Sequence, residues 1–296
     1  MDLQQLFEEI LPGNRLPAQQ VTSVTCDSRQ VRRGSVFVCI AGSLTDGHNY
    51  VVQALQRGAI LVVAQRDCGV PNQLLFPDTR IVYARLCAAF FGYPARKLKL
   101  LGVTGTNGKT TTAWLTHHAL IQLGVKAGLI GTICNRVGEQ SIPARYTTPD
   151  AWELQELLAQ MLQCGCTYVV MEASSQALEQ KRLYGCFFAC AAFTNLTPEH
   201  LDYHGDVESY YQAKRELFSQ CGAAVVNTAD AYGQRLSGSS ANGENIRSPP
   251  LDRQRQSFMQ RISLCRPTAA AAPSATAENS ARRPSACPAA SRWKIC

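Results

Sequence analysis

Short apolar runs alternate with polar, glycine-containing turns over the first part of the chain. The run VFVCIA (36–41) predicts a buried strand, and the turn-rich GSLTDGHNY leads from it to YVVQALQR, which has helical spacing. That helix is expected to end at Gly58, because glycine is favoured just past a helix C-terminus. AILVVA (59–64) predicts the next buried strand. We therefore expect residues 1–97 to form a small α/β domain.

A second alternation of strands and helices begins near residue 97. KLKLLGVTG (97–105) predicts a strand that enters a glycine-rich loop, and a helix is expected from Lys109 to Gly124. A second helix is expected over 150–165. Further apolar runs predict strands at 125–133, 167–173, 187–194 and 223–227. Because alternating strands and helices build parallel sheets with right-handed crossovers, residues 98–236 are expected to form a parallel-sheet domain.

The composition changes abruptly at residue 237. Residues 237–296 contain 10 Ser, 11 Ala, 6 Pro and 8 Arg, with no apolar periodicity beyond a short patch. Such a segment buries too little apolar surface to offset its ordering entropy, so it is expected to be disordered. Its 9 basic and 3 acidic residues give it +6 of the chain's net charge of +7, which leaves +1 for residues 1–236. Charge therefore gives no sign of a nucleic-acid partner for the folded part.

The cysteines and the apolar runs limit the class of protein. Most of the 13 cysteines stand singly in apolar runs, as Cys39 and Cys190 do, where cysteine acts as a small buried hydrophobe. The closest pair, Cys164 and Cys166, has no partner pair at zinc-ligand spacing, so reduced thiols and no structural metal are expected. No apolar stretch approaches the roughly 20 residues that span a bilayer, and MDLQQLFEEI is unlike a signal peptide. We expect a soluble cytoplasmic monomer without a membrane partner.

The segment GVTGTNGKTT (102–111) carries the strongest chemical signal, at a predicted strand-to-helix junction. Glycines let backbone N–H groups turn toward phosphate oxygens, and the helix N-terminus adds its positive end. A lysine here reaches the β and γ phosphates, and the next threonine hydroxyl binds Mg²⁺. The common P-loop pattern has glycine where this chain has Val103. The alternative, a glycine-rich turn with a chance Gly-Lys-Thr, is disfavoured by the strand and helix context. The predicted ATP-binding residues are Gly105, Thr106, Asn107, Gly108, Lys109, Thr110 and Thr111.

Four further stretches agree in order and content with one family. They are CDSRQVRRGSVFVCIAG with TDGHNY, YTTPD (146–150), MEASSQALEQKRL (171–183) and FTNLTPEHLDYHGDVESYYQAKRELF (193–218). Together with GTNGKTT they resemble the Mur ligases, and within that family the UDP-N-acetylmuramoyl-tripeptide synthetases, over nearly all of residues 20–236. The resemblance implies an α/β fold. It places a UDP-substrate-binding domain at 1–97 and an incomplete, P-loop-type parallel-sheet ATPase domain at 98–236, before the low-complexity tail.

The resemblance also implies a reaction in peptidoglycan biosynthesis. The γ-phosphoryl group of ATP passes to a carboxylate of UDP-N-acetylmuramoyl-L-Ala-D-Glu, and the amine of a diamino acid attacks the acyl phosphate. The diamino acid is meso-diaminopimelate or L-lysine. Because two anions approach each other, cations must lie between them, and the expected cofactors are ATP and two Mg²⁺ ions.

Residue roles follow from the same resemblance. Glu172 matches the first Mg²⁺ ligand, although a strand-end glutamate is by itself usually a solvated carboxylate. His200 matches a second-metal ligand, whereas His204, four residues on, is expected to serve packing. Lys214 matches the lysine that the family carbamylates; an isolated lysine on an amphipathic helix is ordinarily part of a solvated face. The predicted catalytic residues are Lys109, Glu172, His200 and Lys214, and the predicted metal ligands are Thr110, Glu172, His200 and Lys214.

Contacts to the muramoyl peptide are implied in two parts of the chain. Ser28, in the first domain, matches a contact to the uridine nucleotide. Gln176 stands where many family members have histidine, and altered detail rather than lost function is expected there. The remaining predicted substrate-binding residues are Thr147, Thr148, Ser174, Gln180 and Arg182, where an arginine fork suits a carboxylate.

The resemblance ends where the composition changes. The family pattern calls for more strands and a further domain, so the change at residue 237 indicates a truncated chain or a shifted reading frame. We expect an exposed sheet edge and poor solubility. Two alternatives stay open beside an active ligase. One is an inactive fragment that binds only nucleotide or UDP-substrate, and the weaker one is a folylpolyglutamate synthetase-like ligase, which shares the glycine-rich loop alone.

Overall fold

A computed structural model describes residues 1–42 and 45–241. Most of the predicted disordered tail, residues 242–296, lies outside these described residues. The last helix, α9 (Ala231–Ala241), continues beyond residue 236, so the domain boundary predicted from composition falls inside a helix. Within residues 1–42 and 45–241, no helix combines the length and apolar character that crossing a membrane requires.

The first sheet has four parallel strands in the order β1-β2-β3-β4. Their bounds are Ser23–Thr25, Ser35–Val38, Ala59–Ala64 and Gln73–Leu75. The strand predicted at 36–41 stops at Val38, because the chain turns back and the amide of Gly47 donates to the carbonyl of Ile40. The strand predicted at 59–64 is confirmed.

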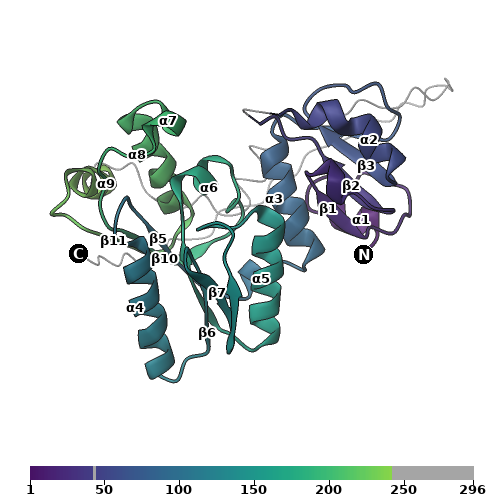
Figure 1. The fold of residues 1–296 in the computed structure, drawn as a ribbon. Coiled ribbons are helices and arrows are strands. Elements are labelled where there is room, and N and C mark those ends of the chain that lie inside the picture. Colours follow the sequence, from purple (N-terminus) through teal and green to yellow (C-terminus); the bar gives the residue numbers. More distant parts are fainter. Residues whose placement is uncertain (43–44, 242–296) are drawn as a thin grey trace, which may run out of the picture. The chain divides into compact units, whose positions relative to one another are not determined.

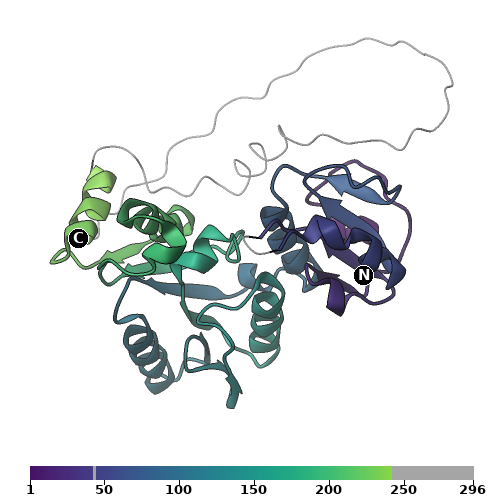
Figure 2. The same cartoon turned by 45° about the horizontal axis from the view of Figure 1, so that its top comes forward.

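Helices cover both faces of this sheet. Helices α1 (Leu3–Phe7) and α3 (Thr79–Phe90) pack on one face, and α2 (Val51–Gln56) packs on the other. Figure 2 shows these elements, in purple and blue, from a second direction. Alternate residues of β3 divide between the two cores: Val63 joins the α1 and α3 side, and Val62 joins the α2 side. Helix α2 ends before Gly58, whose φ of 98° is a left-handed value that favours glycine.

The second sheet has seven strands in the order β11-β10-β5-β9-β6-β7-β8. Strands β5, β6, β9, β10 and β11 are mutually parallel, as predicted. Their bounds are Lys99–Thr104, Ala127–Ile130, Tyr168–Glu172, Phe188–Phe193 and Ala224–Val226.

The expectation of a wholly parallel sheet is wrong at one edge. β7 (Cys134–Val137) and β8 (Gln140–Pro143) form an antiparallel hairpin beside β6. The apolar run 125–133 suggested one strand, but the strand ends at Ile130 and the chain turns back. Gly138, with φ of 58°, forms the hairpin turn in a stretch too polar for a buried strand.

Two long helices cover opposite faces of this sheet (Figure 1). α4 (Lys109–Gln122) packs on the face that includes Val103 and Val170, and α5 (Ala151–Gln163) packs on the face that includes Val169 and Met171. The other helices of the described chain are α6 (Ser175–Glu179), α7 (Leu201–His204) and α8 (Val207–Arg215). Short 3-10 turns cover Ser28–Gln30, Gly47–Tyr50, Pro94–Arg96 and Glu216–Gln220. The carboxyl ends of the parallel strands thus lie along one edge, where ligands bind in open α/β sheets.

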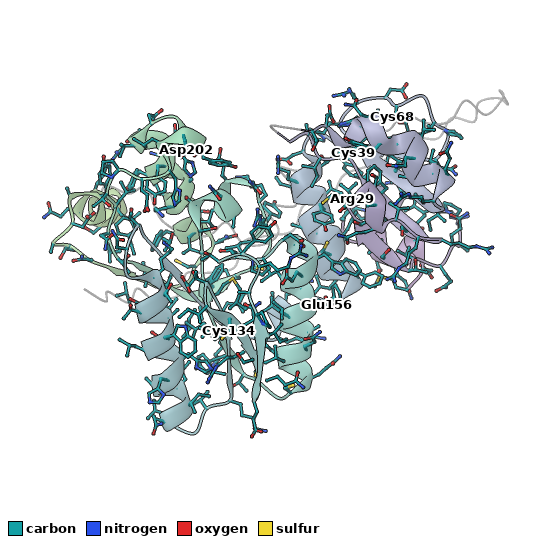
Figure 3. The ribbon with its side chains drawn as sticks, viewed as in Figure 1. Arg29, Cys39, Cys68, Cys134, Glu156 and Asp202 are labelled. Carbon is teal, nitrogen blue, oxygen red and sulfur yellow. The ribbon has the colours of Figure 1, made fainter. Side chains whose placement is uncertain are left out.

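None of the ten cysteines in the described part of the chain forms a disulfide. Figure 3 labels three of them, Cys39 and Cys68 near the first sheet and Cys134 in the second. The side chains of Cys39 and Cys68, 29 residues apart in sequence, are hydrogen-bonded to each other. Burial raises the pKa of Cys39 to about 12, so this thiol stays protonated at neutral pH.

Candidate active site

The glycine-rich loop connects the end of β5 to the start of α4 with an open helix N-terminus. Gly108 precedes the helix with φ of 84°, and no side chain caps the first turn. The first N–H groups of a helix have no intrahelical partner and carry the positive end of its dipole. A Cβ added to Gly105, where φ is 146°, would lie 1.9 Å from the Thr194 hydroxyl oxygen. This loop geometry suits a phosphate group, and it requires glycine at position 105.

A second loop, which follows β10, holds the glycine-rich loop in place. The backbone carbonyl of Asn195 accepts a hydrogen bond from the amide of Thr106 at 2.8 Å. The Asn195 side-chain oxygen accepts from the amide of Asn107 at 2.9 Å, and the Thr194 hydroxyl donates to the carbonyl of Asn107 at 2.6 Å. Two amides of the loop are therefore occupied by protein, while the first amides of α4 have no side-chain cap and no intrahelical partner.

Glu172 lies at the carboxyl end of β9, beside β5, and its side chain is fully buried. Its Oε2 accepts hydrogen bonds from the hydroxyl of Thr110 at 2.8 Å and from that of Thr132 at 3.0 Å. Its Oε1 accepts from the backbone amide of Thr132 at 2.9 Å. The structure thus brings the two predicted Mg²⁺ ligands Thr110 and Glu172 into direct contact. Hydroxyl and carboxylate oxygens are the hard donors that Mg²⁺ prefers, so this pair fits the ion.

Two lysines converge on the glycine-rich loop. Lys109 Nζ donates to the carbonyls of Gly105 and Thr106, at 3.0 and 2.9 Å. Lys214, on α8, is 1% exposed, and its Nζ donates to the same Gly105 carbonyl at 2.7 Å and lies 4.3 Å from the ring centre of Tyr210. Burial, and then the neighbouring charge of Lys109, lower the pKa of Lys214 to about 7. The simple expectation for a helix lysine, a solvated face, is therefore wrong for Lys214.

The two histidines of EHLDYH occupy different surroundings. His200 is exposed, precedes α7 with a left-handed φ of 55°, and its ring centre lies 6.2 Å from that of Tyr210. His204 is buried, with Nε2 2.9 Å from the Ser175 hydroxyl and Nδ1 3.0 Å from a carboxylate oxygen of Glu179. Burial lowers the pKa of His204. The packing role expected for His204 is confirmed. The described residues hold no group of three or more His, Cys, Asp or Glu side chains at metal-binding distance.

Thr147 and Thr148, both predicted to bind substrate, differ in availability. The Thr148 side chain is buried, and its hydroxyl donates to the backbone carbonyl of Glu172 at 2.7 Å and accepts from the amide of Ser174 at 3.0 Å. Ser174 caps α6, since its hydroxyl accepts from the amide of Ala177. Thr147 is only partly buried, and its hydroxyl lies 3.1 Å from that of Thr132. These contacts make Thr148 a support of the loop that follows β9, while Thr147 stays partly exposed.

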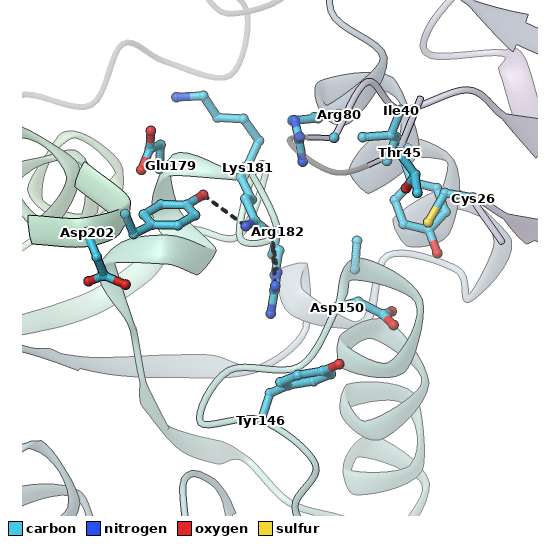
Figure 4. A pocket seen from close by; sticks show the side chains of 15 residues that line it. Cys26, Ile40, Thr45, Arg80, Tyr146, Asp150, Glu179, Lys181, Arg182 and Asp202 are labelled. Atoms are coloured by element: carbon cyan, nitrogen blue, oxygen red, sulfur yellow. Dashed lines mark hydrogen bonds between the residues drawn. The ribbon is translucent and has the colours of Figure 1, made fainter. Parts of the chain in front are cut away.

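A cavity of about 720 Å³ adjoins these residues (Figure 4). Gln180 and Arg182 lie in its wall, where the Gln180 amide donates to the hydroxyl of Tyr203 at 2.9 Å and the Arg182 guanidinium donates to the Gln180 side-chain oxygen at 2.8 Å. The lining carries both charges, with Arg80 and Lys181 beside the carboxylates of Asp150, Glu179 and Asp202. Ser28 is not among the lining residues, and its hydroxyl donates to the Gln53 side chain at 2.8 Å.

Sequence patterns missed three residues that shape this site. Thr132 bonds Glu172, Asn195 holds the glycine-rich loop, and Tyr210 contacts Lys214 and bonds Thr106. Asn195 and Tyr210 lie within the stretch 193–218 that carried the family resemblance, so that stretch held a signal for them. Thr132 lies outside every stretch that carried the family resemblance, within the apolar run 125–133 that predicted an ordinary strand.

Comparison with known families gives two matches. The family described as "Mur ligase middle domain" matches residues 103–261, and "Mur ligase family, catalytic domain" matches residues 20–85. The first match runs past residue 236, where the change of composition predicts the end of the family pattern.

Similar curated proteins are named UDP-N-acetylmuramoyl-L-alanyl-D-glutamate--2,6-diaminopimelate ligase. The one from Geobacter metallireducens is 41% identical over 247 residues, covering 79% of this chain and 48% of the relative. The one from Gloeobacter violaceus is 47% identical over 233 residues, covering 76% of this chain and 47% of the relative. The chain therefore spans about half the length of the curated relatives that it matches.

Solved structures give the same picture of the fold. A structure named UDP-N-acetylmuramoyl-L-alanyl-D-glutamate--2,6-diaminopimelate ligase superposes with a TM-score of 0.71 at 31% identity, over 83% of this chain and 51% of that chain. A structure named UDP-N-acetylmuramoylalanyl-D-glutamyl-2,6-diaminopimelate--D-alanyl-D-alanyl ligase, from Acinetobacter baumannii, has a TM-score of 0.55 at 22% identity, over 81% of this chain and 52% of that chain. The second likeness concerns the fold alone.

Proposed function

Because the chain belongs to the Mur ligase family, we propose that it carries the ATP-binding and muramoyl-peptide-binding part of a peptide ligase. The reaction is the ATP-dependent addition of 2,6-diaminopimelate to UDP-N-acetylmuramoyl-L-alanyl-D-glutamate, the activity that the names of its relatives state. The observation that carries the proposal is the contact between Thr110 and the buried carboxylate of Glu172, directly beside the open N-terminus of α4.

Each part of the site has a task in this reaction. The N–H groups at the start of α4 bind phosphate oxygens of ATP, and Lys109 leaves its loop carbonyls to pair with them. Thr110 and Glu172 hold Mg²⁺, with His200 and Lys214 proposed for a second ion. When bound, Mg²⁺ neutralises charge that develops on the transferring phosphoryl group. Thr147, Gln180 and Arg182 orient the muramoyl peptide so that its carboxylate meets the γ-phosphoryl group in line.

Carbamylation of Lys214 has support in its surroundings. Carbon dioxide reacts with a neutral amine, and burial lowers the pKa of Lys214 to about 7, so much of this amine is neutral at physiological pH. The adduct is an anion, which compensates the positive charges of Lys109 and of metal ions. Carbon-13 NMR of the chain in labelled bicarbonate tests this modification, with Lys214→Met as the control. A carbamate signal that persists in Lys214→Met would show that the modification lies elsewhere.

The two separate sheets support separate binding regions for the two substrates. Strands β1–β4, which precede residue 97 in the sequence, form one sheet, and strands β5–β11, which follow it, form another. We propose that residues 1–97 bind the UDP end of the substrate, with Ser28 near the nucleotide, and that residues from 98 onward bind ATP.

A phosphate-release assay tests the function. The chain is supplied with ATP, Mg²⁺ and UDP-N-acetylmuramoyl-L-Ala-D-Glu, and with meso-diaminopimelate or L-lysine in separate reactions. Turnover that requires both the muramoyl peptide and diaminopimelate supports the ligase. Binding of both ligands without turnover supports the second candidate, a binding module, which is a specific possibility because the relatives are about twice as long. Replacing the peptide by a folate tests the folylpolyglutamate alternative.

A further inference from the structure

Thr132 lies between the two proposed binding regions of the site. It is the second residue after β6, directly following Gly131, and its side chain is exposed. Its backbone amide and its hydroxyl both contact the carboxylate of Glu172, one oxygen each, at 2.9 and 3.0 Å. A fully buried carboxylate depends on such donors for its orientation. Thr132 therefore fixes both oxygens of Glu172 from the open side of the site.

The same hydroxyl also contacts Thr147. The two hydroxyl oxygens lie 3.1 Å apart, and Thr132 Oγ1 has only one hydrogen to donate. Thr132 Oγ1 is the donor toward Thr147 Oγ1 as well as toward Glu172 Oε2, so these two oxygens compete for its one hydrogen. The Thr132 hydroxyl therefore links Thr147 to Glu172 Oε2, which the Thr110 hydroxyl reaches from the nucleotide side at 2.8 Å.

The backbone leaves little freedom to this arrangement. A Cβ added to Gly131 would lie 2.3 Å from Oε1 of Glu172, so the main chain approaches the carboxylate as closely as it can. The amide of Gly131 points to the buried side-chain oxygen of Asn135, at 3.4 Å, and Asn135 lies in the hairpin strand β7. A change at Thr147 is consequently transmitted to Glu172 through the hydroxyl of Thr132 rather than absorbed by movement of the loop.

We propose that Thr132 is a positioning residue that couples binding of the muramoyl peptide at Thr147 to binding of the Mg²⁺-nucleotide at Glu172 and Thr110. This inference rests on the proposed function. A peptide N–H that donates to the Thr147 hydroxyl oxygen takes the place of the Thr132 hydrogen there. Thr132 then relies on its bond to Glu172, and the carboxylate is held more rigidly for the metal. By linkage, the nucleotide strengthens peptide binding by the same factor.

Calorimetric titration of the full chain measures this coupling. The probe is a non-hydrolysable ATP analogue with Mg²⁺, titrated with and without saturating UDP-N-acetylmuramoyl-L-Ala-D-Glu. The wild-type chain and Thr132→Ser, which keeps the hydroxyl, are expected to bind the analogue on the order of fivefold more tightly when the peptide is present. Thr132→Val is expected to lose this factor, while its affinity for the analogue in EDTA stays at the wild-type value. Thr167→Val, at an exposed hydroxyl near the opposite end of β9, is the matched control.

The outcomes separate this inference from the proposed function. If the peptide still increases the affinity of Thr132→Val for the analogue, by a factor within about twofold of the wild-type factor, the coupling role is overturned. The ligase proposal stays intact in that case. Absence of binding of either ligand to the wild-type chain would overturn the proposed function, and with it this inference. Thr147→Val removes the other end of the hydrogen-bond chain, so it carries the test if Thr132→Val does not fold, and it too is expected to abolish the coupling factor.

Discussion

Replacing Thr148 by valine isolates what its buried hydroxyl contributes to stability. Valine has nearly the same shape, so the substitution removes the hydroxyl and leaves the packing volume. The Thr148 hydroxyl donates to the carbonyl of the fully buried Glu172 at 2.7 Å and accepts from the partly buried amide of Ser174 at 3.0 Å. Both partners lose this bond in the variant, and Thr148 itself is 1% exposed, so bulk water does not replace its hydroxyl.

The magnitude follows from these two lost bonds. A buried polar group left without its partner costs about 1–3 kcal/mol, and the cost is smaller for the partly buried amide, so we expect a total of about 2–3 kcal/mol. For a protein of this size that corresponds to a fall of roughly 1 M in the urea midpoint.

Urea denaturation followed by circular dichroism, without any ligand, measures this loss. Thr167→Val is the control, since its hydroxyl makes only a long, exposed contact of 3.5 Å to the carbonyl of Lys126. A Thr148→Val variant that loses less than about 0.5 kcal/mol relative to that control would refute the structural role. Thr148 would then act mainly through the substrate, as the family resemblance alone suggests.

Three further predictions follow from the same contacts. Gly105→Ala places a methyl group 1.9 Å from the Thr194 hydroxyl and strains a φ of 146°, so affinity for an ATP analogue is expected to fall at least about tenfold in a titration; unchanged affinity would mean that the loop adapts freely. Burial lowers the pKa of Lys214 from 10.5 to about 7, so between these pH values the unfolded chain binds one proton more than the folded chain. In bicarbonate-free buffer the free energy of unfolding should therefore rise with pH across that window, by up to about 1.4 kcal/mol per pH unit. The Lys214→Met variant should lack this rise in stability, and a pH profile identical to that of the wild-type chain would contradict the prediction. Burial lowers the pKa of His204, so the folded chain should lose stability as pH falls below 6.5, the pKa of histidine in the unfolded chain. In thermal melts, the His204→Gln variant should not show this acid-dependent fall in melting temperature.

The local pattern of the sequence determined the elements and the phosphate-binding loop. Strands β3, β5 and β9 and helices α4 and α5 follow from apolar spacing and from glycines at helix ends, because these signals act within a few residues of the chain. GTNGKTT was recognisable for the same reason, since backbone shape and chemistry coincide in one short segment.

The tertiary structure alone decided which polar side chains share a site. Glu172 and Thr110 are 62 residues apart in sequence, and Lys214 and the Gly105 carbonyl are 109 apart, yet each pair is in hydrogen-bond contact. The hairpin of β7 and β8 escaped prediction because its polar pattern gains meaning only beside β6. Thr132 had no distinguishing neighbours in sequence, and its role arises where the ends of separate strands meet. Hydrogen bonds depend on distances that the fold sets, so the sequence indicated the chemistry and the folded chain assigned each threonine its partner.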